Sequence, residues 1–108
     1  MDKLKREHNI QNQIRLWCSE HDILCFRCNV GKVKTIYGTW FDTGLPEGFS
    51  DLIILYNATI YFCECKTLIG KQREDQIKFM NVVRQHGYNY FVARSIEDVK
   101  EAINYAMV

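Results

Sequence analysis

Two short apolar runs joined by a two-residue link constrain the fold of this chain more than any other feature. Residues 51–56 and 59–66 predict two strands, and Asn57-Ala58 between them suits a tight hairpin turn. Both faces of this hairpin are apolar, one carrying Ile53, Leu55, Ile60 and Phe62 and the other Leu52, Ile54, Tyr56 and Tyr61. Strands that are apolar on both sides belong in the middle of a sheet covered by helices.

The segments around this hairpin alternate between helical and extended patterns. Ile10, Ile14 and Trp17 stand at helical spacing and predict a helix over 3–20. Residues 23–30 predict a strand that ends at Gly31, and residues 33–41 predict a second strand, which Gly38 weakens. Thr43 to Gly48 is rich in turn residues and predicts a loop.

The second half of the chain predicts two more helices with a strand between them. An amphipathic helix over 71–86 ends before Gly87, and residues 88–93 predict a strand. Ser95 and Asp98 suggest a capping box for a last helix, whose apolar face holds Ile96, Val99, Ile103 and Ala106. The expected order is α-β-β-β-α-β-α, an α/β fold with a mixed central sheet flanked by helices.

Length and composition indicate one globular domain over residues 1–108. The chain is 47% hydrophobic, enough for a core at this size, and no apolar run approaches the length of a membrane span. Its N-terminus does not resemble a signal peptide, and five cysteines are an odd number, so we expect reduced thiols. These features favour the cytoplasm, which we expect to be that of a bacterium or of a phage-infected host.

The hairpin brings two carboxylates and an ammonium together. If Tyr56 pairs with Thr59, then Asp51 lies opposite Glu64, and alternation places Lys66 on the same face. Neighbouring carboxylates repel and need a proton or a cation, and a hard cation such as Mg²⁺ prefers oxygen ligands. The alternative is a structural salt bridge at a strand end.

Two polar residues fall on helix faces that should be apolar. Glu7 shares the stripe of Ile10, Ile14 and Trp17, so we expect it to point inward. Gln76 lies within the arc of Phe79, Met80 and Val83. Each alone is consistent with a structural role, Glu7 beside the helix dipole and Gln76 as a hydrogen-bonded core amide. Together with Asp51, Glu64 and Lys66 they favour a shared site.

These residues, taken in order, resemble a known family. Ser50-Asp51, twelve intervening residues and Glu64-Cys65-Lys66 are similar to the signature of PD-(D/E)XK nucleases. The chain more closely resembles the virus-type replication-repair nuclease domain, VRR-NUC. The matching segments are Arg6 to Gln11, Phe26 to Asn29, Gly48 to Asp51, Glu64 to Thr67, Gln76 to Phe79 and Gly87 to Ser95. Ser50 departs from the family's usual proline, a position that shapes the backbone and supplies no ligand.

The resemblance implies roles for individual residues. Asp51, Glu64 and the backbone carbonyl of Cys65 would bind Mg²⁺, for which Mn²⁺ would substitute, and Glu7 would bind the metal directly or through water. Lys66 would assist the attacking water, with Gln76 supporting either Lys66 or that water. Catalysis would therefore depend on Asp51, Glu64, Lys66 and Gln76.

The resemblance also implies a substrate and an assembly. Small members of the family act as homodimers on branched DNA, including four-way junctions. Tyr37, Trp40 and Phe41 are candidates for the dimer interface, although burial within one subunit is an equal alternative. The residues expected along the DNA are Arg27, Lys32, Lys34, Lys71 and Arg73. No membrane or small-molecule cofactor is expected.

Three alternative functions remain open from the sequence. A zinc site could use Cys25, Cys28, Cys63 and Cys65, although residues three apart on a strand face opposite ways. A second alternative is a DNA-binding module of this fold that has lost catalysis. The third is a restriction-type endonuclease that reads a base sequence.

Overall fold

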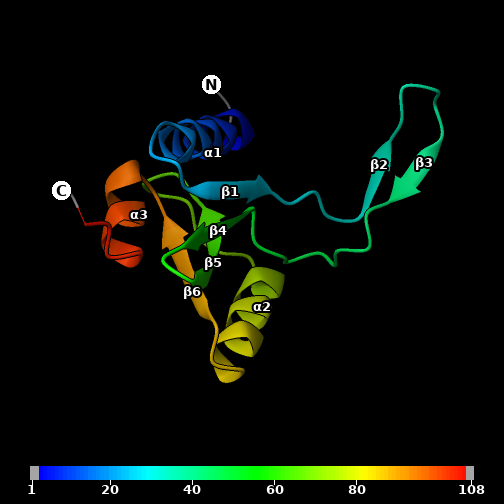
Figure 1. Ribbon diagram of the computed structural model, residues 1–108. Helices are drawn as coiled ribbons and strands as arrows, with labels where there is room; N and C mark the ends of the chain where they lie inside the picture. The colour runs from blue at the N-terminus through cyan, green and yellow to red at the C-terminus, as the bar shows by residue number, and fades with distance from the viewer. Residues whose placement is uncertain (1–2, 107–108) are drawn as a thin grey trace.

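The computed structural model describes residues 3–106 of the chain, and the side chains from Arg6 onward. A four-stranded sheet forms its centre, with α1 and α3 on one face and α2 on the other (Figure 1). The elements in chain order are α1 (Lys3–Glu20), β1 (Leu24–Arg27), β2 (Lys32–Lys34), β3 (Trp40–Asp42), β4 (Leu52–Tyr56), β5 (Thr59–Cys65), α2 (Glu74–Gln85), β6 (Asn89–Ala93) and α3 (Ile96–Ala102).

The central sheet is mixed, as the sequence predicts. Its strand order is β1-β4-β5-β6, in which β1, β4 and β5 pair antiparallel and β6 joins β5 in parallel. The link between β4 and β5 has left-handed backbone at both residues, with φ of 52° at Asn57 and 60° at Ala58, as a two-residue hairpin turn requires. Tyr56 therefore pairs with Thr59, which confirms the predicted register.

The two faces of the hairpin differ in how completely they are buried. Leu52, Ile54, Cys63 and Cys65 are fully buried in the main core against α1 and α3. The opposite face packs on α2 through Phe62 and Phe79, whose ring centroids are 5.8 Å apart. Ile60, next to the turn, stays 44% exposed. The expectation of full burial on both faces is therefore wrong near the turn, where burial against α2 fades.

Residues 33–41 form no continuous strand, contrary to prediction. They belong to a separate hairpin of β2 and β3 that projects from the body of the molecule (Figure 1). Gly38 has a φ of 82° and reverses the chain, and the backbone N–H of Thr35 donates to the carbonyl of Thr39 at 2.7 Å. The local reason is the left-handed glycine, which a straight strand does not accommodate.

Several element ends also differ from prediction. β1 ends at Arg27 and α2 begins at Glu74, while Gly87, with a φ of 83°, follows α2 as expected. Ser95 caps α3 by accepting from the N–H of Asp98, but the Asp98 carboxylate accepts from the N–H of Arg94, so the capping box is not formed. Ala106 lies beyond the end of α3. None of the helices described has the length and hydropathy needed to cross a membrane.

Candidate active site

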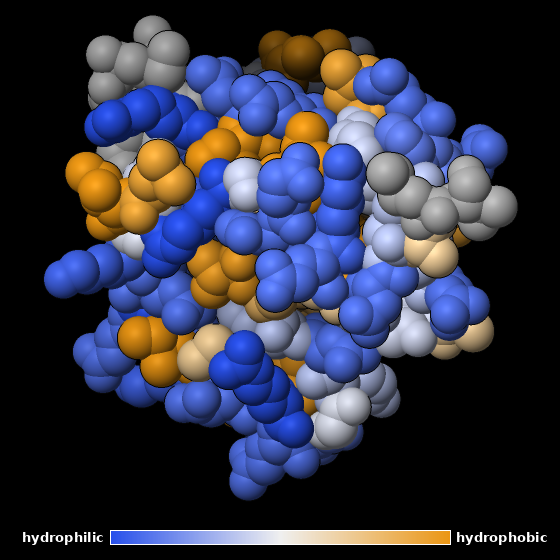
Figure 2. All heavy atoms as spheres, turned by 90° about the vertical axis from the view of Figure 1, so that its left-hand side faces the viewer, coloured by the Kyte–Doolittle hydropathy of each residue, from blue (hydrophilic) through white to orange (hydrophobic). Residues whose placement is uncertain are grey.

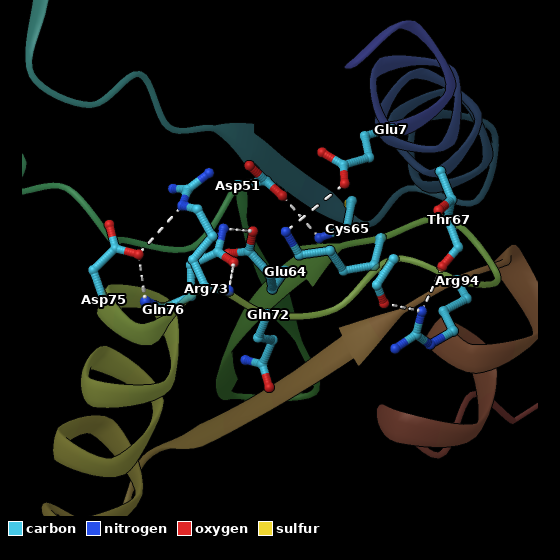
Figure 3. A network of polar contacts seen from close by, with 12 residues as sticks. Glu7, Asp51, Glu64, Cys65, Thr67, Gln72, Arg73, Asp75, Gln76 and Arg94 are labelled. Atoms are coloured by element: carbon cyan, nitrogen blue, oxygen red, sulfur yellow. Dashed lines mark hydrogen bonds and ion pairs between the residues drawn. The ribbon is translucent and has the colours of Figure 1, made fainter. Parts of the chain in front are cut away.

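Asp51 and Glu64 lie at one end of the central hairpin, where the strand register places them. Leu52 pairs with Cys63, so the next positions outward are Asp51 and Glu64. Asp51 is held by its Oδ2, which accepts a hydrogen bond of 2.8 Å from the backbone N–H of Cys65. Figure 3 shows both side chains extending into the same region between α1 and α2. The predicted juxtaposition of the two carboxylates is therefore confirmed.

Gln76 fixes the orientation of Glu64. It is the third residue of α2, and its Oε1 accepts the backbone N–H of Arg73 at 2.8 Å, satisfying a free donor at the helix start. Its Nε2 must then face away, and it donates to Glu64 Oε1 at 2.7 Å (Figure 3). The side-chain partner of Gln76 is thus Glu64 rather than Lys66. The other oxygen, Glu64 Oε2, is buried and has no hydrogen-bond partner.

The electrostatic environment of Glu64 disfavours its charged form. Its side chain is among the most buried in the described chain, with 1% relative exposure. Burial raises the pKa of Glu64 to about 9, the negative charge of Asp51 and a hydrogen bond between the protonated Glu64 carboxyl and Asp51 add to this, and the positive charges of Lys66 and Arg73 oppose it. Without a cation, this carboxyl is protonated near neutral pH. A buried carboxyl beside a second carboxylate is the arrangement that a bound cation would compensate.

Lys66 and Glu7 form a second charged pair next to the carboxylates. Lys66 is 2% exposed, and its Nζ lies 3.8 Å from Glu7 Oε1. Glu7 reaches this position from α1, as its place on the apolar stripe predicts (Figure 3). Burial makes an isolated ammonium unfavourable, so Glu7 supports the charge of Lys66. Glu7 Oε1 accepts no hydrogen bond, which leaves it able to accept one from a ligand or water.

Gly48 lets the loop before Asp51 pack against the start of α2. Its φ is 90°, and a Cβ at this position would lie 2.5 Å from the carbonyl oxygen of Asp75. Only glycine fits such a contact without displacing the backbone. Sequence reasoning noted Gly48 only as part of a motif. Its structural role is to bring the Asp51 loop and the Gln76 helix together.

The side chains that could hold a cation here are two carboxylates, Asp51 and Glu64, rather than a larger cluster. Among the described residues, no group of three or more His, Cys, Asp or Glu side chains is placed to hold a metal ion. Glu7 pairs with Lys66 and does not join Asp51 and Glu64 in such a group. Cys63 and Cys65 point into the main core, so the zinc alternative gains no support from the residues described.

The basic residues expected to contact DNA are all exposed, but they lie in three separate parts of the chain. Lys71 and Arg73 follow Lys66 in the segment that leads to α2, and Arg73 also forms an ion pair of 3.3 Å with Asp75. Lys32 and Lys34 lie on the projecting hairpin, and Arg27 ends β1. Sequence reasoning missed Arg94, which donates to the carbonyls of Thr67 and Gly70 beside the site. Its place directly after β6 was the only signal.

Comparison with known proteins agrees with this geometry. The model of the VRR-NUC domain family matches residues 5–97. A solved structure described as a VRR-NUC domain superposes with a TM-score of 0.66 and 21% identity, covering 94% of this chain and 98% of that chain, which shows a shared fold. No curated protein matches the chain. Because the family model spans most of its length and the fold agrees, the chain belongs to the VRR-NUC family.

Proposed function

We propose that this nuclease-type domain is a Mg²⁺-dependent endonuclease that hydrolyses phosphodiester bonds in DNA. The observation that carries the proposal is the unpartnered, buried Oε2 of Glu64 beside the Asp51 carboxylate. A cation fits this position, because the chain otherwise leaves a buried polar atom unsatisfied and two acidic groups uncompensated. A structural salt bridge at a strand end explains the arrangement less well, because Lys66 is buried beside the two carboxyls.

The proposed ligands are Asp51, Glu64 and the backbone carbonyl of Cys65, with Glu7 contributing through water. Mg²⁺ keeps several waters and needs few carboxylates when phosphate completes its coordination, which suits a set of two. Bound there, Mg²⁺ or Mn²⁺ would polarise a phosphoryl oxygen and lower the pKa of a bound water. Glu7 Oε1 lies 3.8 Å from Lys66 Nζ, so we propose that Glu7 contacts the metal through a water molecule and not directly.

The remaining residues position and stabilise the reacting groups. Lys66 carries three donors on a buried ammonium, so it can orient the attacking water and offset the negative charge that develops on the phosphate. Gln76 holds Oε1 of Glu64 and thereby directs Oε2 toward the ligand side. Gln76 is thus a positioning residue, and its amide orientation is set by the start of α2.

Cleavage should require a divalent cation. We expect EDTA to abolish hydrolysis of DNA, Mg²⁺ or Mn²⁺ to restore it, and Ca²⁺ to support binding without cleavage. The measurement is a gel assay on labelled DNA with a parallel binding titration. Full activity in EDTA would eliminate the metal mechanism. Binding without cleavage in every cation would instead favour the module that has lost catalysis.

Three isosteric substitutions should remove turnover and leave the fold intact. Asp51→Asn, Glu64→Gln and Lys66→Met should each lower the cleavage rate by about 100-fold or more, since each removes a charge next to the reacting phosphate. Single-turnover rates would be compared at equal folded protein, checked by circular dichroism. Cys63→Ala is the matched control, because Cys63 neighbours Glu64 but points into the core. Near-normal cleavage by folded Lys66→Met would refute the role of Lys66.

The metal-free protein should become less stable as pH rises. The folded pKa of Glu64 is raised to about 9, while an unfolded glutamate titrates near 4.3, so the folded state binds more protons between these values. Stability is therefore greatest below this window and is lost as pH rises through it. Glu64→Gln should flatten the dependence, and Mg²⁺ should stabilise the wild type most at the alkaline end. Thermal unfolding across pH measures both, and an unchanged slope in Glu64→Gln would contradict the assignment.

We further propose that the protein is a homodimer that prefers branched DNA, with the β2–β3 hairpin at its interface. Five large hydrophobic side chains of this hairpin are exposed: Val33 (37%), Ile36 (92%), Tyr37 (86%), Trp40 (67%) and Phe41 (59%). The face on the α3 side carries hydrophobic atoms only in small separate patches (Figure 2). Exposed apolar side chains gathered on one projecting hairpin favour a protein partner, and a two-fold dimer supplies two matched cuts.

Substitutions in the β2–β3 hairpin should prevent dimer formation without changing the active site. We expect wild-type protein to be dimeric by light scattering and to convert a plasmid-borne cruciform into linear product through paired cuts. Tyr37→Ser with Trp40→Ser should give a monomer that mainly nicks the same plasmid, since the site itself is untouched. A monomeric wild type that cuts linear and four-way DNA equally would overturn the assembly and leave the nuclease standing. Cutting confined to one base sequence would favour the restriction-type alternative.

A further inference from the structure

The turn that follows Lys66 presents two aliphatic side chains to solvent. Gly70 N–H donates to the carbonyl of Thr67 at 3.1 Å and closes a β-turn, with Leu68 and Ile69 at its centre. Their relative exposures are 83% and 82%. Turn centres normally hold glycine, proline, asparagine, aspartate or serine, so the turn does not require aliphatic residues here. Their exposure means that folding does not use them either, and a ligand contact explains them better.

Hydrogen bonds from Arg94 hold both ends of this turn. One nitrogen of the Arg94 guanidinium, Nη1, donates to the carbonyls of both Thr67 and Gly70, the latter at 2.7 Å (Figure 3). Thr67 and Gly70 are themselves buried. Both ends of the turn are therefore fixed, and Leu68 and Ile69 are held on a rigid support. Because the turn is already held in one conformation, it loses less conformational entropy when Leu68 and Ile69 insert into a ligand.

The turn adjoins both the candidate active site and an open hollow of about 430 Å³. Lys66 immediately precedes it, and a Cβ at Gly70 would lie 3.6 Å from Glu7 Oε1. The hollow lies between the turn and α1, and its lining includes Leu68, Ile69, Ile10, Arg6 and Gln13. Aliphatic walls with amide and guanidinium donors at the rim match the flat apolar faces and polar edge of a nucleobase.

We propose that Leu68 and Ile69 insert beside a nucleotide next to the scissile phosphate and that the hollow receives its unstacked base. This inference rests on the proposed nuclease function and names the feature of DNA that the site selects. Aliphatic side chains cannot hydrogen-bond phosphate, so they contact bases rather than backbone. In continuous duplex the base must first leave its stack, whereas at a branch it is already weakly stacked. Each active site therefore selects branched DNA by itself, apart from any dimer symmetry.

The test combines a fluorescent base with paired cleavage rates. A 2-aminopurine placed at the branch of a DNA junction reports unstacking in Ca²⁺, where DNA stays uncut. Wild-type protein should raise its fluorescence, and Leu68→Ala with Ile69→Ala should remove most of the rise. In Mg²⁺ the double variant should cut the junction about tenfold more slowly, with little change on linear duplex of the same sequence. Leu16→Ala, at an exposed position of α1, is the matched control.

The possible outcomes separate this inference from the proposed function. If wild-type protein cuts no DNA, the nuclease proposal fails, while loss of the fluorescence rise in the double variant still supports base insertion. Equal slowing on both substrates, or an unchanged fluorescence rise, overturns base insertion with the nuclease intact. Dissociation of a dimer in the double variant, with fluorescence unchanged, would instead assign the turn to a contact between two copies and also overturn it.

Discussion

The antiparallel pairing of β4 with β5 is the constraint on which the rest of the site depends. Its register follows from the two-residue turn at Asn57 and Ala58, and a slip of one residue would exchange Glu64 with a core position. Left-handed backbone costs roughly 1–2 kcal/mol for a residue with a Cβ such as Ala58. The buried residues farther from the turn offset this, since Leu52, Ile54 and Cys63 are fully buried in the observed register.

The same register places Glu64 in surroundings that disfavour its charged form and compensate for it only in part. Cys63 and Cys65 are buried in the main core, so alternation along β5 places Glu64 on the opposite face, where it contacts Gln76 of α2. Burial and the charge of Asp51 then oppose its ionisation. Gln76 donates to one oxygen of Glu64, and the other oxygen receives no hydrogen bond from the described residues. Under the proposed function, this open oxygen serves the bound cation at the expense of the stability of the free protein.

The spacing of residues within each element was enough to predict which side chains meet at the candidate site. It did not predict the contacts that depend on how distant elements pack together. The turn length gave the Asp51–Glu64 pair, and helical periodicity gave the inward side chains of Glu7 and Gln76. Periodicity did not show that Gln76 binds Glu64, because that contact joins elements twelve residues apart. The alternating pattern of apolar and polar residues also predicted one strand over the residues of β2 and β3, because this pattern is the same on both sides of Gly38. The position of Arg94 after β6 did not show which carbonyls it binds, because Thr67 and Gly70 lie far away in the chain.

The proposed function places chemistry and substrate choice in parts of this fold that differ in how strongly packing constrains them. Asp51, Glu64, Lys66 and Gln76 are fixed by the central hairpin, by Gly48 and by the start of α2, so changes there disturb packing as well as charge. The β2–β3 hairpin and the Leu68–Ile69 turn contribute almost nothing to the core. Exposed residues of this kind change with little effect on stability. DNA preference can therefore vary through these two segments while the hydrolytic site stays the same.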